Sequence, residues 1–477
     1  MLEIAALLLL SVAAAPPEPL ATLTLPVAAS GDEAGRSIAF DGRRVLLGAP
    51  NHDAAAPNAG AAQVFRLAAG GTWVAEALLV APDALADDSF GLSVAIDGEV
   101  ALVGALDDDV NGKSSAGSAH VYRLVDGLWT HEATLLASDA AANDQFGRSV
   151  AIRGDIAIVG SWQSLSAFGK GAAYVFKRQA NGTWLQTQKL APPDAATGDA
   201  NGTSVTFDGT RAVVGAFGDD VGSTTNQGSA SVFRLEPNGT FVFEAKLIGN
   251  AGAFEECGRG VALDDSLCVV GSWPFFASSQ GGTGQGAAYV FRRSGTTWAQ
   301  EAKLTAPDAA TDDYFAFSVA CRRGDDGDLV ACGAWADDIG RVTNQGSVWL
   351  FRTGGTPATW SAEAQLVAPD GAGSDYFGFS LALSCEMLAV GTRLDDVGAA
   401  TNQGTARLWW IDDGGNDEPD SCIDPADLTR NGAVGGDDLA ILLGAWGTPG
   451  ADADLTGDGT VDGADLAALL GAWSAGA

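Results

Sequence analysis

The chain is poor in basic residues and in histidine. Its 477 residues include 26 Lys and Arg against 60 Asp and Glu, which gives a formal net charge of −34. A surface of this sign repels nucleic-acid phosphates and anionic lipid, so neither is an expected partner. Only three histidines are present, which leaves little material for imidazole-based catalysis.

Long apolar runs are also missing from the body of the chain. Beyond the N-terminal segment, no run approaches the roughly 18 apolar residues of a membrane-spanning helix, so no membrane span is predicted. Residues 4–15 are mostly apolar, too short to cross a bilayer, and end in three alanines before Pro16. This pattern predicts a signal peptide over residues 1–15, although Glu3 stands where Lys or Arg is typical. We therefore expect an extracellular protein, secreted or associated with a cell surface.

Glycine, in contrast, is plentiful, and many of the 63 glycines belong to an internal repeat. One copy begins Phe90-Gly91-Leu92-Ser93, and the frame returns with a period of about 56 residues. The glycine position of the seven copies falls at Gly35, Gly91, Gly147, Gly202, Gly258, Ala316 and Gly378.

Each complete copy contains four short apolar runs whose alternation and β-branched content are typical of strands. In the second copy the runs are residues 91–96, 100–104, 118–124 and 129–136, and Asp97-Gly98 predicts a two-residue hairpin turn. The seventh copy stops after its third run, whereas an additional run stands at residues 20–27, before the first copy. We therefore predict an all-β fold, a seven-bladed β-propeller over residues 16–411 that the N-terminal strand closes.

This frame resembles the FG-GAP repeats of integrin α-chain propellers. Phe-Gly pairs occur at Phe90-Gly91, Phe146-Gly147 and Phe377-Gly378, and the Gly-Ala-Pro triplet remains at residues 48–50. The resemblance implies a propeller over about residues 20–411 and says little of function, because such propellers serve many roles. Integrin-type repeats often carry a calcium loop between the first two strands, but most copies here have only a tight turn. The acidic segment 323–328 of the sixth copy is either a calcium loop or a solvated loop.

The strand order assigns charges to two faces of the propeller. Acidic residues gather on one face, in two kinds of segment. The loops between the second and third strands contain Asp107–109, Asp219–220, Asp337–338 and Asp395–396. The links between copies contain Asp87–88, Asp144, Asp199, Glu255–256, Asp312–313 and Asp375. The opposite face collects arginines, among them Arg44, Arg66, Arg123, Arg211, Arg234, Arg292 and Arg352. Two interpretations of the acidic face remain open. It binds divalent cations or attracts a basic partner, or its aspartates have the structural role of shaping turns by accepting backbone hydrogen bonds.

Several features that suggest catalysis or ligand binding have a simpler structural interpretation. The recurring Gly-x-Ser lacks the second glycine of a hydrolase elbow and lies inside a strand, so we interpret it as structural. His52, His120 and His131 fall in different blade contexts without metal-ligand spacing. Tryptophans at the start of the fourth strands are interpreted as packing anchors: Trp73, Trp129, Trp184, Trp298 and Trp360. Trp162, Trp273 and Trp335 follow second strands toward the acidic face, where they either stack on sugar rings or belong to the core.

The six cysteines do not define a disulfide pattern. Two pairs stand eleven residues apart, Cys257 with Cys268 and Cys321 with Cys332. If every copy turns at the position of Asp97-Gly98, Cys268 lies opposite Val261 and Cys332 opposite Phe317, so neither pair faces itself across the hairpin. No connectivity is assigned.

The composition changes after residue 411. Residues 412–423 are polar and acidic and are interpreted as a linker. Two similar loops follow, at residues 427–438 and 454–465, and each precedes a Leu-rich run that ends at Trp446 or Trp473. Oxygen-bearing side chains at loop positions 1, 3, 5 and 12, with Gly at position 6, match an EF-hand-like calcium loop.

Two such units near a C-terminus resemble a dockerin domain, here over residues 424–477. The resemblance implies two Ca²⁺ sites. The ligands would be Asp427, Thr429, Asn431 and Asp438 in the first loop, and Asp454, Thr456, Asp458, Asp462 and Asp465 in the second, with the Thr460 carbonyl at position 7. The first loop has Gly435 at position 9, where the second has Asp462, so we expect tighter binding at the second site. Dockerins bind cohesin modules, which implies a cohesin-like or cell-surface partner.

Together these patterns favour a non-catalytic binding or surface protein, whose propeller presents loops to a protein or glycan ligand and whose tail docks with calcium. The alternatives are a polysaccharide-active enzyme and a lectin. Against the enzyme, no paired-carboxylate or His-based constellation stands outside the repeat frame.

Overall fold

The computed structural model describes residues 18–27, 29–68, 71–162, 169–274, 285–324, 327–354, 359–384, 387–411, 434, 436–448, 453, 455–456 and 460–473. The expected signal peptide 1–15 and linker 412–423 lie outside these residues. No helix of the described part is long and apolar enough to cross a membrane.

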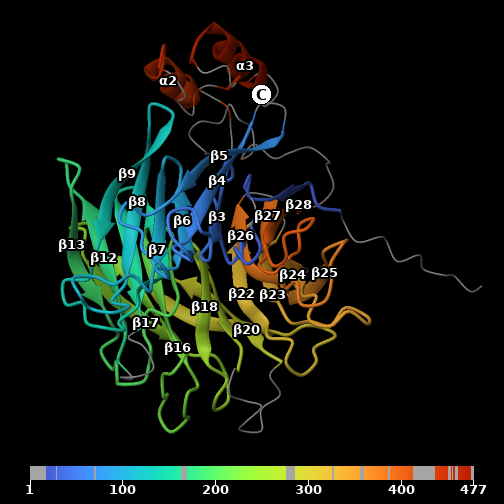
Figure 1. Cartoon of the computed structure of the whole chain (residues 1–477). Helices are drawn as coiled ribbons and strands as arrows, with labels where there is room; N and C mark the ends of the chain where they lie inside the picture. The colour runs from blue at the N-terminus through green and yellow to red at the C-terminus, as the bar shows by residue number, and fades with distance from the viewer. Residues whose placement is uncertain are drawn as a thin grey trace, which may run out of the picture.

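Within the described ranges, the chain forms seven antiparallel sheets of four strands, arranged as the blades of a propeller (Figure 1). Blade 1 consists of β2 (Ser37–Phe40), β3 (Arg44–Ala49), β4 (Ala61–Leu67) and β5 (Trp73–Leu79). Blade 2 consists of β6 (Phe90–Asp97), β7 (Val100–Ala105), β8 (Ser118–Val125) and β9 (Leu128–Leu135). Blade 3 consists of β10 (Phe146–Arg153), β11 (Ile156–Ser161), β12 (Ala172–Arg178) and β13 (Trp184–Leu190). Blades 4 and 5 are β14 (Val205–Phe207), β15 (Arg211–Ala216), β16 (Ser229–Leu235) and β17 (Phe241–Leu247); and β18 (Cys257–Asp264), β19 (Leu267–Ser272), β20 (Ala287–Ser294) and β21 (Thr297–Leu304).

Blade 6 is β22 (Phe315–Arg322), β23 (Leu329–Ala334), β24 (Ser347–Gly354) and β25 (Thr359–Leu366). Blade 7 combines β26 (Phe377–Ser384), β27 (Met387–Thr392) and β28 (Thr405–Trp410) with β1 (Ala21–Leu23). Two helices follow, α2 (Gly436–Gly444) and α3 (Gly463–Trp473).

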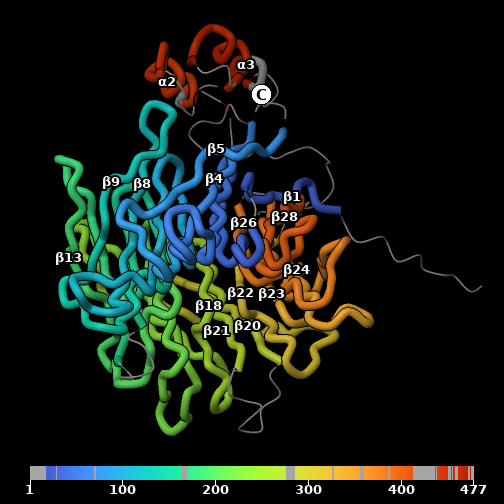
Figure 2. Tube along the Cα trace, viewed as in Figure 1, coloured from blue at the N-terminus to red at the C-terminus, as the bar shows by residue number. Residues whose placement is uncertain are grey.

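The ring closes through the N-terminal strand, as the sequence predicts. β1 runs antiparallel to β28, with Ala21 opposite Leu408 and Leu23 opposite Ala406, and the two strands lie side by side in Figure 2. The innermost strands also form a closed circuit, because β2 contacts both β6 and β26. Residues from the two ends of the propeller sequence therefore share one blade, and closure leaves only outer blade edges unpaired.

The Phe-Gly frame forms a β-bulge at the start of the innermost strand. In blade 2 the pairing of β6 with β7 shifts register between Phe90 and Ser93. Gly91 there has a φ of 93°, and a Cβ on it would lie 2.2 Å from the Ala61 carbonyl oxygen of blade 1. Glycine is needed at this position for both its backbone conformation and its close contact with the preceding blade.

The serine of Gly-x-Ser links neighbouring blades at six of the seven junctions. The Ser93 hydroxyl donates to the Gly147 carbonyl of the following blade at 2.7 Å. The same bond occurs from Ser37 to Gly91, Ser149 to Gly202, Ser204 to Gly258, Ser318 to Gly378 and Ser380 to Gly35. The structural interpretation of this motif is thereby confirmed, since the hydroxyls are used as blade-to-blade donors.

The junction between blades 5 and 6 departs from this pattern on both sides. Gly260 stands where the other copies have serine, and Ala316 stands at the glycine position of the next blade. Ala316 keeps a positive φ of 62°, so the bulge persists without glycine. At this junction the serine donor is therefore missing, and the residue at the acceptor position, Ala316, has a strained backbone.

The hydrophobic core lies between neighbouring blades. One buried cluster joins Leu102 and Val121 of blade 2 to Phe146, Val159 and Tyr174 of blade 3. Another unites Leu23 with residues of blades 1 and 7. Each blade is therefore buried against its neighbours on both faces, which explains the nearly continuous apolar content of the second strands.

The closing strand yields a direct test. Deleting residues 16–28 is expected to expose the edge of β28 and cause aggregation or a large drop in melting temperature, because an unpaired strand edge and an apolar cluster become exposed. Leu23→Ala should cost about 2–4 kcal/mol of unfolding free energy, since Leu23 is buried.

Thr22→Ala is the matched control, because Thr22 is exposed on the same strand. It should change the unfolding free energy by less than about 0.5 kcal/mol. Equal stability of the Leu23 and Thr22 variants in urea unfolding would contradict the closure.

Candidate functional site

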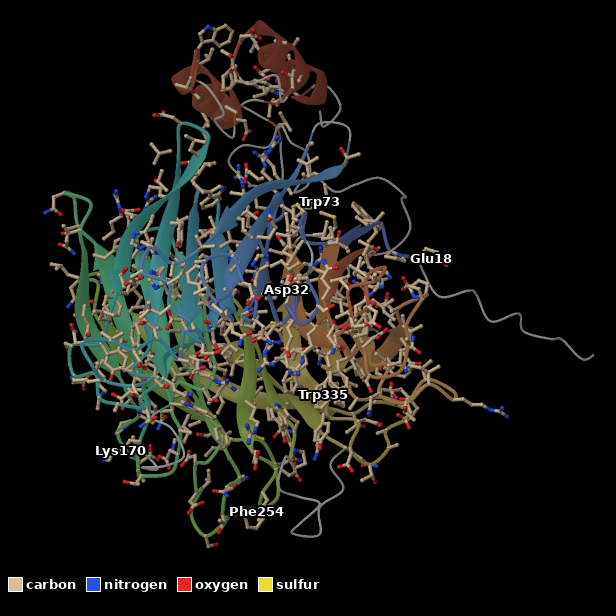
Figure 3. The ribbon with its side chains drawn as sticks, viewed as in Figure 1. Glu18, Asp32, Trp73, Lys170, Phe254 and Trp335 are labelled. Carbon is tan, nitrogen blue, oxygen red and sulfur yellow. The ribbon has the colours of Figure 1, made fainter. Side chains whose placement is uncertain are left out.

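The acidic loops face the same end of the propeller as the blade-to-blade links. Before six of the seven innermost strands, a link aspartate accepts a hydrogen bond from a backbone amide three residues upstream. These pairs are Asp32 with Ala29, Asp88 with Leu85, Asp144 with Ala141, Asp199 with Ala196, Asp313 with Ala310 and Asp375 with Ala372. Asp32 is marked in Figure 3. These carboxylates build the turns that deliver the chain to the next blade.

The second-to-third loops use their aspartates in the same way. In blade 4, Asp220 accepts from the Asn226 amide at 2.7 Å, and Asp219 accepts from the Ser229 hydroxyl at 2.5 Å. The equivalent amide bonds join Asp53 to Asn58, Asp109 to Ser115, Asp338 to Asn344 and Asp396 to Asn402. Turn chemistry thus accounts for these carboxylates and for the recurring Asn-Gln-Gly segments.

Burial within these turns raises the pKa of several of the carboxyl groups. Burial raises the pKa of Asp88 to about 6. The hydrogen bond from the Leu85 amide lowers this pKa, whereas the negative charges of Asp108, Asp83 and Asp109 raise it further. Burial likewise raises the pKa of Asp337 to about 6. The folded acidic face therefore binds protons more readily than the unfolded chain does.

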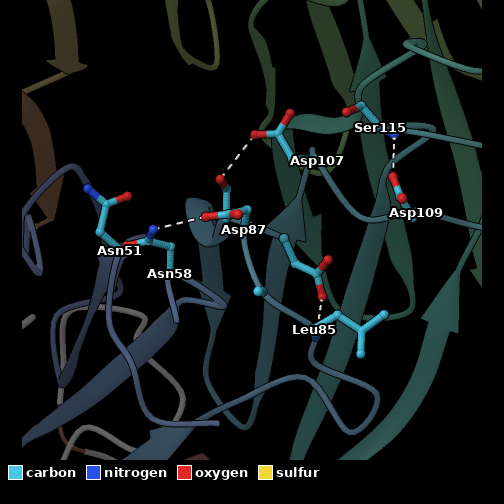
Figure 4. A pocket seen from close by; sticks show the side chains of 10 residues that line it. Asn51, Asn58, Leu85, Asp87, Asp107, Asp109 and Ser115 are labelled. Atoms are coloured by element: carbon cyan, nitrogen blue, oxygen red, sulfur yellow. Dashed lines mark hydrogen bonds between the residues drawn. The ribbon is translucent and has the colours of Figure 1, made fainter. Parts of the chain in front are cut away.

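A polar pocket of about 480 Å³ opens among these loops between blades 1 and 2 (Figure 4). Asp87 accepts from the Asn58 side chain at 2.9 Å, Asp107 accepts from Ser89 at 3.0 Å, and Asp109 accepts from the Ser115 amide. Each labelled carboxylate already has a donor. In the described part of the chain, no group of three His, Cys, Asp or Glu side chains is arranged to hold a metal ion.

The opposite face is less basic than its arginines alone suggest. Glu76, on the outer strand of blade 1, accepts from Arg44 of its own blade at 2.8 Å and from the Trp129 indole of blade 2 at 3.0 Å. The same Arg–Glu pairing recurs for Arg211 with Glu244, Arg292 with Glu301 and Arg352 with Glu363. In the sequence, the signal for this network is the glutamate of a recurring fourth-strand motif, Trp-x-x-Glu-Ala-x-Leu, as at residues 73–79. These glutamates neutralise arginines that we expected to make this face basic.

The fourth-strand tryptophans are packing residues, as predicted, and several also bridge blades. Trp298 donates to Glu244 and Trp360 donates to Glu301, each across a blade junction. Trp73, which is labelled in Figure 3, lies in blade 1. Its ring contacts that of Phe40 edge-on within the same blade. Trp162, Trp273 and Trp335 are half-buried and pack against other aromatic rings, so they do not form flat exposed platforms.

Two of the three histidines are neighbours, which the sequence reading missed. His120 on β8 and His131 on β9 approach to 3.4 Å between ring nitrogens, and Ser118 contacts His120 at 3.0 Å. Burial lowers the pKa of His120 to about 4, so this imidazole stays neutral at ordinary pH. Their eleven-residue separation across one hairpin could have revealed the contact.

The cysteine register differs from the expectation by two residues. The hairpin turn of blade 2 consists of Gly98 and Glu99, because Asp97 pairs with Val100. The turn thus lies one residue later than predicted, and in the corresponding hairpins Cys268 faces Leu263 and Cys332 faces Val319. The conclusion that these pairs do not face each other is confirmed: Cys257, Cys268, Cys321 and Cys332 are free thiols.

The expected calcium loops are described only in part. Asp427, Thr429, Asn431, Asp454 and Asp458 lie outside the described residues, as do Asp325 and Asp326 of the acidic segment 323–328. Asp438 and Asp465, at position 12 of the two loops, are both fully buried at the start of α2 and α3. Thr460 is exposed.

The second loop converges on Asp465. One carboxylate oxygen accepts from the Thr456 amide at 2.8 Å and its hydroxyl at 3.0 Å, and the other accepts from the Asp462 amide at 2.7 Å. Burial alone would raise the pKa of Asp465, but these hydrogen bonds hold it below its usual value. Three of the expected ligand positions are thus brought together around an ionised carboxylate.

The two loop–helix units also pair with each other. The Gly447 amide donates to the Val461 carbonyl at 2.8 Å, and the Val461 amide donates to Thr448. Leu442 and Leu469, one from each helix, share a small core with Val461 and Leu455. The two units are therefore joined by backbone hydrogen bonds of Gly447 and Thr448 with Val461 and by a shared apolar core.

A comparison with protein families matches the propeller region. The family described as the FG-GAP repeat matches residues 19–65, 73–122, 129–176, 184–233, 298–351 and 360–407. Each match after the first begins near the outer strand of one blade and continues into the next. The interval around β18 is unmatched, where Cys257 and Gly260 replace the usual Phe and Ser. A search of curated proteins finds no match.

The raised carboxyl pKa values predict a pH dependence of stability. Since the pKa of Asp88 is about 6 in the folded state and its ordinary value is 3.8, the folded state takes up protons as pH falls below 7. The unfolding free energy should therefore rise from pH 7.5 toward pH 5. Asp88→Asn, which retains an acceptor for Leu85, should stabilise the protein by roughly 1–2 kcal/mol at pH 7.5, and less toward pH 5.

Asp126→Asn serves as the control, because it removes the same charge from an exposed turn. Urea unfolding at several pH values provides the comparison. An Asp88→Asn effect equal to that of Asp126→Asn at every pH would refute the desolvation argument.

Proposed function

Because the chain belongs to the FG-GAP repeat family, we propose that it is an extracellular, non-catalytic binding protein whose propeller presents loops to a ligand and whose tail docks to a partner with calcium. FG-GAP propellers are typically binding folds, and they are often extracellular. The polar side chains that recur in the loops and in Gly-x-Ser are engaged in hydrogen bonds that build the scaffold.

The observation that carries the calcium part is the geometry around Asp465. Position-12 carboxylates that are buried and ionised need a compensating donor set, which in this loop consists of Thr456 and Asp462 backbone amides. Asp454, Asp458 and the Thr460 carbonyl would complete an oxygen shell suited to Ca²⁺. In the first loop, Asp427, Thr429, Asn431 and Asp438 would do the same with one side-chain ligand fewer.

The helices supply a surface for the partner. Ile441, Leu443 and Trp446 on or just after α2 are 43%, 52% and 47% exposed, and Leu470 on α3 is 48% exposed. Apolar side chains of this size are typical of an interaction surface when they cluster on a small unit. We propose a cohesin-like or other cell-surface protein as the partner.

A lectin role is the second candidate, with a glycan on the propeller. Trp162, Trp273 and Trp335 lie toward the loop face and are partly accessible, but their rings already contact other side chains. No observation in the described structure favours the polysaccharide-active enzyme.

Calcium titration of the full chain tests the tail. The wild type should bind two Ca²⁺ ions in isothermal titration calorimetry, and Asp465→Ala should remove the tighter event, because the loop loses its buried carboxylate. Asp427→Ala should weaken the other event only. A chain truncated after residue 411 controls for calcium bound by the propeller.

A pull-down of cell-surface proteins by the full chain, carried out in calcium and in EGTA, then tests docking. Partner binding should require calcium and be lost in Asp465→Ala. Calcium binding that is identical in the wild type and the truncated chain would refute the proposal.

A further inference from the structure

Arginines from non-adjacent blades meet near the propeller axis. The residue that follows the bulge glycine is Arg36 in blade 1, Arg148 in blade 3 and Arg259 in blade 5. Burial, with repulsion from Arg36 and Arg259, lowers the pKa of Arg148 to about 10. Because blades 1, 3 and 5 do not touch around the ring, their side chains can only meet toward its centre.

A fourth arginine joins this group from blade 7. Arg393 follows β27, and burial together with repulsion from Arg36 lowers its pKa. Arg36 and Arg393 both lie over the Phe379 ring, at 5.2 and 4.7 Å from its centroid. We call Arg36, Arg148, Arg259 and Arg393 the axial arginine cluster.

Aromatic rings hold these guanidinium groups in place. Arg148 lies over Trp162 at 4.6 Å, and Arg259 lies over Phe217 at 3.8 Å and Trp273 at 4.2 Å. Further ring contacts connect Trp162 to Phe217, Trp273 to Phe317 and Phe317 to Phe379. Stacking occupies the flat face of each guanidinium and leaves its N–H donors at the edge.

The carboxylates around the cluster do not balance it. Glu256 pairs with Arg259 at 2.6 Å, and Glu33 is shared between Arg36 at 3.2 Å and Arg393 at 3.7 Å. Among the described residues, no carboxylate lies within ion-pair distance of Arg148, although Asp107 attracts it from farther away. Four guanidinium groups therefore have two direct carboxylate partners in a protein of strongly negative charge.

We propose that the axial arginine cluster is a binding site for an oxyanion, a carboxylate or sulfate group that accepts hydrogen bonds from Arg148 and its neighbours. Guanidinium edges match the two oxygens of such groups, and the half-buried setting strengthens the interaction. The bound anion would relieve the mutual repulsion of Arg36, Arg148 and Arg259.

The surroundings limit the size and charge of this ligand. The Arg36 and Arg393 side chains are 26% and 20% exposed, so solvent reaches the cluster at these two arginines, whereas the Arg259 side chain is only 9% exposed. The acidic links and second-to-third loops stand at the same end of the blades, and they would repel a polyanion. A single small oxyanion, free or at the tip of a partner's side chain, is the class that fits. This inference rests on the propeller's role as a binding module and not on the tail.

Full-length protein in EGTA provides the test, so that calcium docking by the tail plays no part. Sodium sulfate and sodium glucuronate are titrated at constant ionic strength by calorimetry, and a short acidic peptide is titrated separately. Arg148→Met keeps the contact with Trp162 and removes the charge, and it should weaken binding at least about ten-fold. Arg148→Lys provides a second variant that retains charge but not the planar donors, and it should be intermediate.

Arg153→Met is the matched control, since Arg153 is a half-exposed arginine on the same strand, paired with Asp97. It should bind like the wild type. Binding of sulfate or glucuronate would identify a free oxyanion as the ligand, and binding of the peptide alone would assign the site to a partner's carboxylate. Absence of binding by all three probes, or equal binding by Arg148→Met and wild type, would overturn the proposal without affecting calcium-dependent docking.

Discussion

The hydrogen bond from a serine hydroxyl on one innermost strand to a glycine carbonyl of the next blade is the contact on which the rest of the propeller depends. It occurs at six of the seven blade junctions, between residues such as Ser93 and Gly147. The acceptor is available because the glycine adopts a positive φ in a bulge, where a Cβ would collide with the preceding blade. One short motif thus sets the spacing of blades, orients the carbonyl and leaves the intervening residue free to vary.

This division of labour explains where chemistry can arise on such a scaffold. Glycine and serine are committed to the ring, and the loop aspartates are committed to turns, as Asp88 and Asp220 illustrate. The residue that follows the bulge glycine forms no such junction bond, and in blades 1, 3 and 5 it is arginine. Variation at that single position places charge at the axis without disturbing the junctions.

Much of the fold follows from periodicity in the sequence. The seven copies, the four strands of each and the completion of blade 7 by β1 are all visible in the repeat frame, because identical packing problems at each junction select similar residues. The predicted register of the hairpin between the first two strands is wrong by one turn residue, since Asp97 pairs with Val100 and Gly98-Glu99, with glycine at the first position, also fits a two-residue turn. Local turn chemistry alone does not choose between them.

Contacts between blades were harder to foresee. The pairing of Glu76 with both Arg44 and Trp129 joins residues 32 and 53 positions apart. The meeting of Arg36, Arg148 and Arg259 depends on ring geometry that no single repeat contains. The expected calcium ligands, in contrast, follow from loop spacing within one unit, and three of these residues, Thr456, Asp462 and Asp465, are joined by hydrogen bonds.

The central claim, that the serine-to-glycine bond holds neighbouring blades together, is tested most directly by urea unfolding of Ser93→Ala beside Ser114→Ala, an exposed loop serine. The account predicts that Ser93→Ala lowers the unfolding free energy by about 1 kcal/mol or more, because the partly buried Gly147 carbonyl loses its donor, whereas Ser114→Ala leaves it unchanged. Equal unfolding free energies for the two variants would contradict it.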